Sequence, residues 1–214
     1  MELPSTIAEP VTHEIVIKRS RFITHLAPVS TVDQAQDVIA AVGRQHWTAN
    51  HNCVAMALGT RAEIRRSSDD GEPSGTAGVP MMEVLLHRKV TDLVAVVTRY
   101  FGGVMLGAGG LIRAYGSAVS QALDLAPLIH RRLMTSVTLD VDHAQAGRID
   151  HWLRDWASSQ QAVMATTTYG PRLATFSLLV PPQALSLLQA DVAAVSSGSV
   201  TALCGSQQVA DVPA

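Results

Sequence analysis

Glycine residues crowd one segment of this chain, between Val94 and Ala118. Five of them fall within nine positions, and these are Gly102, Gly103, Gly107, Gly109 and Gly110. An apolar run typical of a β-strand precedes them and ends in Thr98, Arg99 and Tyr100, and a helical pattern follows. A strand that leads through a glycine-rich turn into a helix exposes backbone N–H groups at the positive end of the helix dipole. The segment therefore predicts an anion site, with Arg99 and Arg113 as its bracketing cations.

Two common phosphate-binding patterns are not met in this segment. Gly107 and Gly109 begin a dinucleotide fingerprint, but Ile112 occupies the place of its last glycine. No Gly-Lys-Ser/Thr sequence of a P-loop follows either. Two interpretations therefore stay open: contact with an anion or an RNA backbone, and tight turns that serve only helix–strand packing.

A second candidate segment is the loop from Ser67 to Pro80. Its candidate site residues are Asp69, Asp70, Glu72, Ser74, Gly75 and Thr76. Clustered carboxylates could act in acid–base chemistry or hold a hard divalent cation, although the spacing of a calcium loop is absent. The alternative is a solvated turn in which Ser74 or Thr76 caps the next helix and the acids pair with arginines.

A basic patch lies near the N-terminus. It consists of Lys18, Arg19 and Arg21, with Phe22 beside them. Strand alternation would send Lys18 and Arg19 to opposite faces. The patch could grip a nucleic-acid backbone, or it could be a charged edge strand that discourages aggregation.

Other reactive side chains do not form a familiar site. His46, His51 and Cys53 have no fourth ligand nearby and match no standard zinc pattern. Cys53 stands in an apolar strand, which favours a buried and unreactive thiol. Ser74 lacks the flanking glycines of a nucleophile elbow. We therefore assign no catalytic residue, no metal site and no cofactor.

Periodicity predicts the elements that must position these segments. The first part of the chain is read as a strand or hairpin over 14–26, helices over 32–42, 79–87 and 111–125, and strands over 52–58, 63–67 and 93–98. Gly43 is expected to stop the first helix. The second part is read as strand 133–141, helix 144–157, strands 162–169 and 173–180, helix 182–195 and strand 199–204. This is a β-α-β-β-α-β order typical of a ferredoxin-like unit, with a frayed tail from Gln207.

Composition narrows the class of protein. The 214 residues are 47% hydrophobic and carry a net charge of −2, so the chain can form a sizeable core and is not broadly basic. Strong sequence-independent binding of naked nucleic acid is therefore disfavoured, although a local basic patch is not. We see neither a membrane-spanning run nor a signal peptide and expect a cytoplasmic protein without a membrane partner.

Four strings of the sequence resemble those of one family. They are KRSRFI at 18–23, NHNCVAMALG at 50–59, SSDDGEPSGTAGVPM at 67–81 and VVTRYFGGVMLGAGGLIRAYGSA at 96–118. In order and spacing they resemble the YigZ/IMPACT family, in its bacterial two-domain branch. The resemblance covers most of residues 18–125. The last 80 or so residues are similar to the smaller domain of that branch by pattern only.

This resemblance implies a fold and a field of activity. It implies an α+β domain over 1–130, similar to domain IV of the translocating elongation factor. A ferredoxin-like domain over 131–214, similar to that factor's domain V, would follow. Eukaryotic relatives regulate translation by competing for an activator of a stress kinase. Bacteria lack that circuit, so only an association with ribosomes or RNA is carried over. The family supplies no catalytic residues.

Three functions therefore remain. The preferred one is a non-enzymatic, translation-associated regulator that binds RNA or the ribosome through an anion-binding surface. The second is an enzyme that acts on a small phosphorylated or carboxylated substrate. The third is a protein-interaction module. The first requires the loop at 67–80 and the glycine-rich segment to meet in space.

Overall fold

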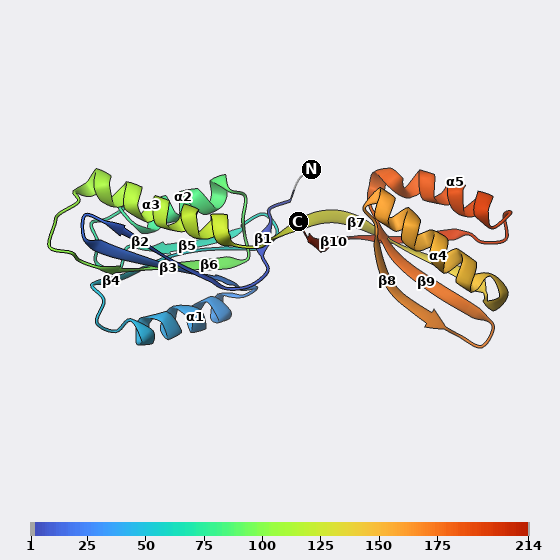
Figure 1. Ribbon diagram of the computed structural model, residues 1–214, viewed down its shortest axis with the longest axis horizontal. Coiled ribbons are helices and arrows are strands. Elements are labelled where there is room, and N and C mark those ends of the chain that lie inside the picture. Colours follow the sequence, from blue (N-terminus) through green and yellow to red (C-terminus); the bar gives the residue numbers. More distant parts are fainter. Residues whose placement is uncertain (1–2, 214) are drawn as a thin grey trace. The chain divides into compact units, whose positions relative to one another are not determined.

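Two compact units make up residues 3–213, which the computed structural model describes (Figure 1). The first contains the described residues up to Arg131 together with Val212 and Pro213, and the second is Arg132–Asp211. Each unit combines helices with a β-sheet. The predicted mixed α+β class is therefore confirmed.

The first unit contains a five-stranded antiparallel sheet with the strand order β2-β3-β6-β4-β5. Its strands are β2 (Val11–Ile17), β3 (Ser20–Pro28), β4 (His51–Leu58), β5 (Ile64–Ser68) and β6 (Leu93–Tyr100). The short strand β1 (Thr6–Ile7) pairs instead with β7. The central strand β6 is buried on both faces, which explains its unbroken apolar run from Leu93 to Val97.

Helices cover both faces of this sheet, as Figure 1 shows. They are α1 (Val32–Gln45), α2 (Gly78–His87) and α3 (Ala108–Leu125). The larger core lies under α2 and α3, where Phe22, Leu85 and Tyr115 are fully buried. A smaller core lies under α1, around Val42 and Met56. The sequence predicted all three helices.

Two predicted helix ends differ from the structure. Helix α1 does not stop at Gly43 but continues to Gln45, where the His46 amide donates to the Val42 carbonyl. Helix α3 starts at Ala108 rather than Leu111, because the chain turns at Gly107 with φ +70°. Gly109 and Gly110 therefore lie in the first turn of α3 and not in a free loop.

A two-residue turn joins β2 to β3, and it corrects the expected alternation. Lys18 and Arg19 both have positive φ, 45° and 69°, as in a type I′ hairpin turn. They are therefore turn residues and do not alternate between the faces of a strand. The turn packs closely on the glycine-rich loop, since a Cβ at Gly102 would overlap the backbone of Arg19.

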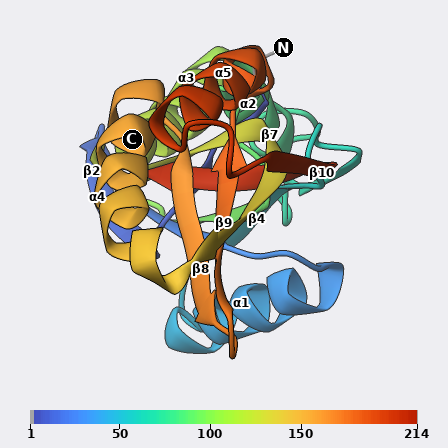
Figure 2. The same cartoon turned by 90° about the vertical axis from the view of Figure 1, so that its right-hand side faces the viewer.

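The second unit has the predicted β-α-β-β-α-β order. Its elements are β7 (Leu128–Asp142), α4 (His143–Gln160), β8 (Val163–Tyr169), β9 (Leu173–Val180), a 3₁₀ turn (Pro182–Ala184), α5 (Leu185–Val195) and β10 (Ala202–Pro213). The strands are ordered β10-β7-β9-β8, and both helices pack on one face of them (Figure 2). The expected frayed tail from Gln207 is wrong, because these residues continue β10, which pairs with β7.

The close approach at Gly102 predicts a large effect of one methyl group. Gly102→Ala should lower the free energy of unfolding by about 1–3 kcal/mol, since the overlapping atoms are backbone and cannot rotate away. Urea unfolding followed by circular dichroism measures the change. Gly109→Ala is the matched control, because its Cβ would meet only the flexible end of Arg113, and it should be neutral or stabilising. Equal stability of both variants would contradict this interpretation.

Candidate functional site

A buried ion pair joins the two segments that the sequence singled out. Arg99 Nη1 lies 2.6 Å from Glu72 Oε1, and the two side chains are only 7% and 3% exposed. The Tyr115 hydroxyl donates to the same oxygen at 2.7 Å. The loop at 67–80 is therefore fixed to the end of β6 and to α3, as the preferred function required.

The surroundings of Arg99 hold its guanidinium inside the unit. The group lies 5.3 Å from the ring centre of Phe22 and 5.6 Å from that of Phe101. Its Nη2 donates to Ser20 Oγ at 3.4 Å, and its Nε is buried without a partner among the described residues. This burial corrects the expectation that Arg99 brackets an anion from solution. Arg99 supports the loop from within.

The Asp69 carboxylate organises the loop and the start of α2. It accepts the backbone N–H groups of Gly75 at 2.8 Å, Ala77 at 3.0 Å and Gly78 at 2.8 Å. Burial of the carboxylate raises its pKa, but these three donors outweigh burial and lower the pKa below its ordinary value. Asp69 thus does the capping that was expected of Ser74 or Thr76. Thr76 instead donates to the Pro73 carbonyl at 2.6 Å.

The remaining carboxylate of the loop is also engaged. Asp70 accepts the backbone N–H of Asn52 at 2.6 Å, and its carbonyl oxygen lies 2.8 Å from Nδ1 of His51. Asn52 in turn accepts the hydroxyl of Thr98 at 2.6 Å. Asp69, Asp70 and Glu72 therefore have separate partners and do not converge on one point.

The buried thiol and phenol beneath the loop are held protonated. Burial raises the pKa of Cys53 to about 12, and burial also raises that of Tyr115. The Cys53 thiol donates to the Asp69 carbonyl at 2.9 Å and to the Tyr115 hydroxyl at 3.3 Å. This environment gives a structural thiol, as the sequence indicated.

The residues whose types could suggest a zinc site, His46, His51 and Cys53, do not lie together. His46 Nδ1 lies 3.0 Å from the Tyr100 hydroxyl, whereas His51 faces Asp70. Over the described part of the chain, no group of three or more His, Cys, Asp or Glu side chains is placed to hold a metal ion. Within residues 3–213, no helix combines the length and apolar character needed to cross a bilayer.

The glycines of the second segment have different roles. Gly102 has no side chain, so the backbone of the hairpin turn can pack closely against it. Its N–H donates to Ser20 Oγ at 3.2 Å. Gly103 and Gly107 have positive φ and turn the exposed loop. Gly109 lies beside the guanidinium of Arg113, whose Nη1 is 3.6 Å from the position of a Cβ there, an ordinary van der Waals contact. Arg113 thus bends back toward the N-terminus of α3.

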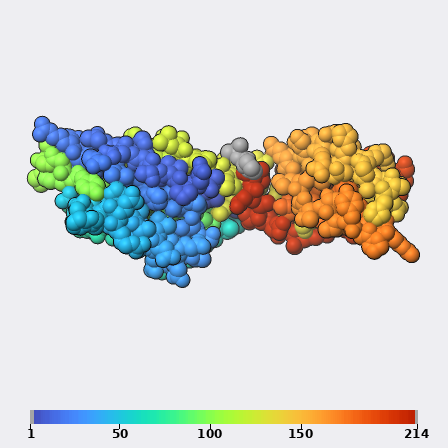
Figure 3. All heavy atoms as spheres, turned by 60° about the horizontal axis from the view of Figure 1, so that its bottom comes forward, coloured from blue at the N-terminus to red at the C-terminus, as the bar shows by residue number. Residues whose placement is uncertain are grey.

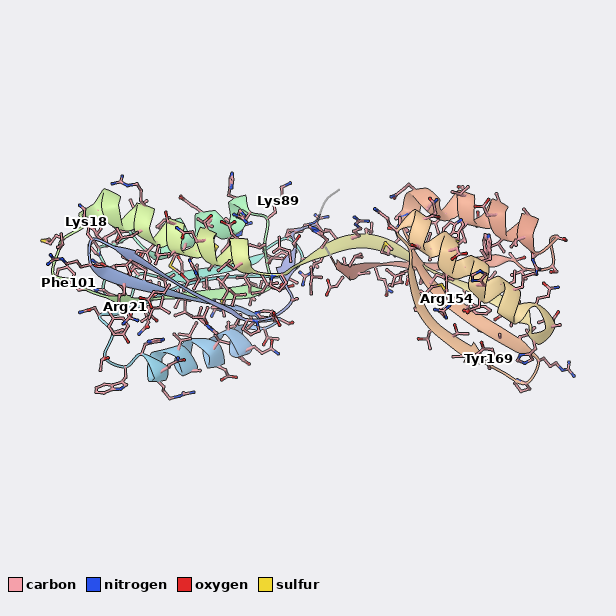
Figure 4. The ribbon with its side chains drawn as sticks, viewed as in Figure 1. Lys18, Arg21, Lys89, Phe101, Arg154 and Tyr169 are labelled. Atoms are coloured by element: carbon pink, nitrogen blue, oxygen red, sulfur yellow. The ribbon has the colours of Figure 1, made fainter. Side chains whose placement is uncertain are left out.

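Among the exposed cations of the first unit, Lys18 and Arg21 lie at one end, where Figure 4 labels them near Phe101. Arg21 binds the Glu14 carboxylate at 2.7 Å and lies over the Tyr100 ring at 5.4 Å. Lys18 and Arg19 are exposed in the turn, and Arg113 is exposed on α3. Among the residues that the structure describes, none of these last three pairs with a carboxylate.

Sequence reasoning missed several residues of this site. Ser20, Asn50 and Tyr115 receive or donate hydrogen bonds that hold the two segments together. Tyr115 stands at a buried helical position, where a tyrosine needs a hydroxyl partner, and that signal could have identified it. No local pattern marks Ser20 or Asn50, because their partners lie 79 and 51 residues away.

Comparison with known proteins identifies relatives of the chain. The family model described as the Impact N-terminal domain matches residues 18–123. The IMPACT family member YvyE of Bacillus subtilis is 52% identical over 150 residues, which are 70% of this chain and 69% of that protein. The IMPACT family member YigZ of Escherichia coli is 42% identical over 145 residues, 67% of this chain and 71% of the relative.

A eukaryotic protein and a solved structure are also similar to this chain. Protein IMPACT of Rattus norvegicus is 34% identical over 105 residues, covering 46% of this chain and 32% of that protein. One solved structure, titled "Crystal structure of an hypothetical protein", has a TM-score of 0.59 and 35% identity. It covers 95% of this chain and 97% of its own.

The buried ion pair predicts a strongly non-additive pair of variants. Glu72→Ala should lower the free energy of unfolding by about 3–5 kcal/mol, because it leaves the Arg99 cation buried and unpaired. The double variant with Arg99→Met should lose less than Glu72→Ala alone, since no charge remains buried. Urea unfolding of the single and double variants measures the difference. Glu14→Ala, in an exposed pair, is the control and should change little. If the double variant lost the sum of the stability losses of Glu72→Ala and Arg99→Met, the stabilising role of the ion pair would be contradicted.

The lowered pKa of Asp69 predicts a dependence of stability on pH. Its folded pKa lies below the unfolded value of about 3.9, so its stabilisation is present above that value and is lost as pH falls through the folded pKa. Asp69→Asn should cost about 1–3 kcal/mol at pH 7, because an amide N–H would face backbone donors. The gap between variant and wild type should shrink near pH 3. A gap that stays constant across unfolding curves at both pH values would refute this role.

Proposed function

The chain belongs to the IMPACT family, and from that premise we propose that its first unit binds RNA, free or in the ribosome, through the exposed cations at one end. The protein acts there as a non-enzymatic regulator of translation, in the cytoplasm and without a membrane partner. The surface that we assign to this role, the basic end, consists of Lys18, Arg19 and Arg113 with the exposed loop at 103–107.

The observation that carries this proposal is a local surplus of positive charge. In the described structure the carboxylates near the basic end are engaged internally: Asp69 with amides, Asp70 with Asn52 and Glu72 with Arg99. Lys18, Arg19 and Arg113 keep their charge for an external partner. A chain with a net charge of −2 can therefore still present a local site for phosphate.

The backbone of the hairpin turn supports the same role. Two-residue turns with positive φ at both positions favour Asn-Gly, whereas this turn has Lys18 and Arg19. Non-glycine residues in this region cost about 1–2 kcal/mol each. Basic side chains are thus kept at a place where folding alone would favour other residues, which is typical of a functional site.

The N-terminus of α3 adds to the attraction for anions. The amides of its first turn have no intrahelical partner, and the helix dipole is positive there. Arg113 lies beside this end of the helix, with its Nη1 3.6 Å from the position that a Cβ at Gly109 would take. Phosphate oxygens of an RNA backbone can accept hydrogen bonds both from backbone amides and from a guanidinium.

The domain arrangement implied by the resemblance forms part of the proposal. We take 1–130 as the IMPACT-type domain, similar to domain IV of the translocating elongation factor, and 131–214 as a ferredoxin-like domain. The division of the compact units near Arg131 supports the boundary, and the strand order β10-β7-β9-β8 supports the ferredoxin-like arrangement. A translational setting follows from that similarity.

A protein partner is the second candidate, on a specific observation. The loop at 101–107 exposes Phe101, Val104 and Met105, the last at 84%. Exposed apolar side chains gathered on one loop are typical of a protein contact. Binding that does not change with salt concentration would favour this candidate, whereas phosphate contacts weaken steeply with salt.

One double variant separates function from stability at the hairpin turn. Lys18→Asn with Arg19→Gly should raise the free energy of unfolding by about 1 kcal/mol, because it relieves the left-handed backbone. It should at the same time weaken RNA binding and make the dependence of log K on log salt shallower, by about 0.7 for each phosphate that the variant no longer neutralises. Fluorescence anisotropy with a labelled RNA at several salt concentrations measures both.

The control for this experiment is Arg61→Ala. Arg61 is exposed and follows the C-terminal end of β4, whereas the N-terminal end of β4 pairs with the end of β6 that leads into the glycine-rich loop. The loss of Arg61 should therefore leave RNA binding and the salt slope unchanged. Arg113→Ala should weaken binding as the double variant does. If the wild type binds neither RNA nor ribosomes, or if Arg61→Ala weakens binding as much as the other variants, the proposed function fails.

A further inference from the structure

One face of the first unit's sheet is only partly covered by helix. Helix α1 packs over β4 and β6, where Val42 meets the buried core around Val54 and Val96. Strands β2 and β3 and the end of β6 extend beyond it. Figure 3 shows the blue strands exposed beside the light-blue α1. We call this uncovered area the open sheet face.

Strand register determines which residues share the open sheet face. Val16, Arg21 and Tyr100 are neighbours across β2, β3 and β6, and Ile23 and His25 continue the same side of β3. Val16 is 63% exposed, and the side chain of Arg21 is 51% exposed. An apolar residue, a guanidinium and a phenol ring thus stand side by side on this face.

The aromatic ring at the centre of this face is held in place. The Tyr100 hydroxyl lies 3.0 Å from His46 Nδ1, and Arg21 lies over the ring at 5.4 Å. Arg21 is itself fixed by two hydrogen bonds to Glu14, of 2.7 and 2.9 Å. A ring and a guanidinium plane that are ordered before binding lose little freedom when a flat ligand stacks on them.

The segment that follows α1 carries an exposed tryptophan. Trp47 follows His46 in the chain and is 82% exposed. Its segment is not loose: the Asn50 N–H donates to the Arg99 carbonyl at 3.0 Å, and Asn50 Oδ1 accepts the Phe101 N–H at 2.8 Å. Folding of the first unit does not account for an indole left in water on a fixed segment.

The charges around the open sheet face are mostly positive. Lys18, Arg19 and Arg21 are exposed at its edge, and the carboxylate of Glu14 on the same face is bound by Arg21. Burial, together with the nearby His46, lowers the pKa of His25, so this imidazole is neutral at pH 7. The face therefore combines flat, uncharged rings with a cationic border.

We propose that the open sheet face, together with Trp47 on the segment that follows α1, is a stacking platform for the unpaired bases of single-stranded RNA, in which Trp47 and Tyr100 are the stacking residues. This inference rests on the proposed function and specifies its ligand. The guanidinium of Arg21, which lies over the Tyr100 ring, presents its own plane to a base, and Lys18 and Arg19 attract the phosphates that join the bases.

Single-stranded RNA fits this chemistry better than a duplex. Bases within a duplex have their faces covered by neighbouring pairs, so an aromatic ring cannot stack on them. Unpaired bases expose both faces, and base–aromatic stacking combined with a cationic border tolerates many sequences. The open sheet face offers planes and charges rather than a row of directed hydrogen-bond donors.

The test compares RNA forms and aromatic variants in the full-length chain. The probes are a labelled single-stranded RNA of about a dozen nucleotides and the corresponding duplex, a length within the range that stacking platforms bind. Trp47→Ala and Tyr100→Ala should each weaken single-strand binding at least about fivefold. Trp47→Phe and Tyr100→Phe keep a ring and should stay within about twofold of the wild type. Tyr169→Ala, an exposed aromatic of the second unit, is the matched control and should have no effect.

The outcomes separate this inference from the function on which it rests. If the hairpin double variant weakens RNA binding but both alanine variants bind as the wild type does, the stacking platform is refuted and the proposed function stands. Equal affinity for single strand and duplex also refutes it. If the wild type binds neither form, both proposals fail. Trp47 gives a second readout, because stacking should quench fluorescence that the Trp47→Phe variant lacks.

Discussion

The first unit depends on one buried ion pair, between Glu72 and Arg99. Two charges taken out of water are tolerated only where their geometry is good and further hydrogen bonds satisfy them. Tyr115 and Ser20 supply such bonds, and the rings of Phe22 and Phe101 flank the guanidinium. The pair thus fixes the acidic loop over the end of β6 and beside α3.

This constraint divides the charged residues into two groups. The acids of the loop are used within the unit: Asp69 holds three amides and Glu72 holds Arg99. Lys18, Arg19 and Arg113 do not take part in this network. The positive character of this end follows from the internal use of the negative charges rather than from the composition of the chain.

Several features could be predicted from the sequence because local chemistry decides them. The apolar run of β6 and the amphipathic helices α1 and α3 were identified by periodicity, and the buried thiol of Cys53 by its apolar neighbours. The failures arose where tertiary contacts took over. Helix α1 passes through Gly43, and the tail beyond Gln207 is held in a strand because it pairs with β7.

The sequence by itself determined the family, the mixed α+β class and the two candidate segments, because each of these is written in residues that are neighbours in the chain. Only the tertiary structure decided what the individual residues of those segments do. Arg99 lies 27 residues from Glu72 and 79 from Ser20, and no local pattern predicts which side chain meets which across such distances. Strand register and helix packing determine these contacts. They bury Arg99, which the sequence predicted to bind phosphate, and they place Tyr100 beside Arg21 on an uncovered face of the sheet.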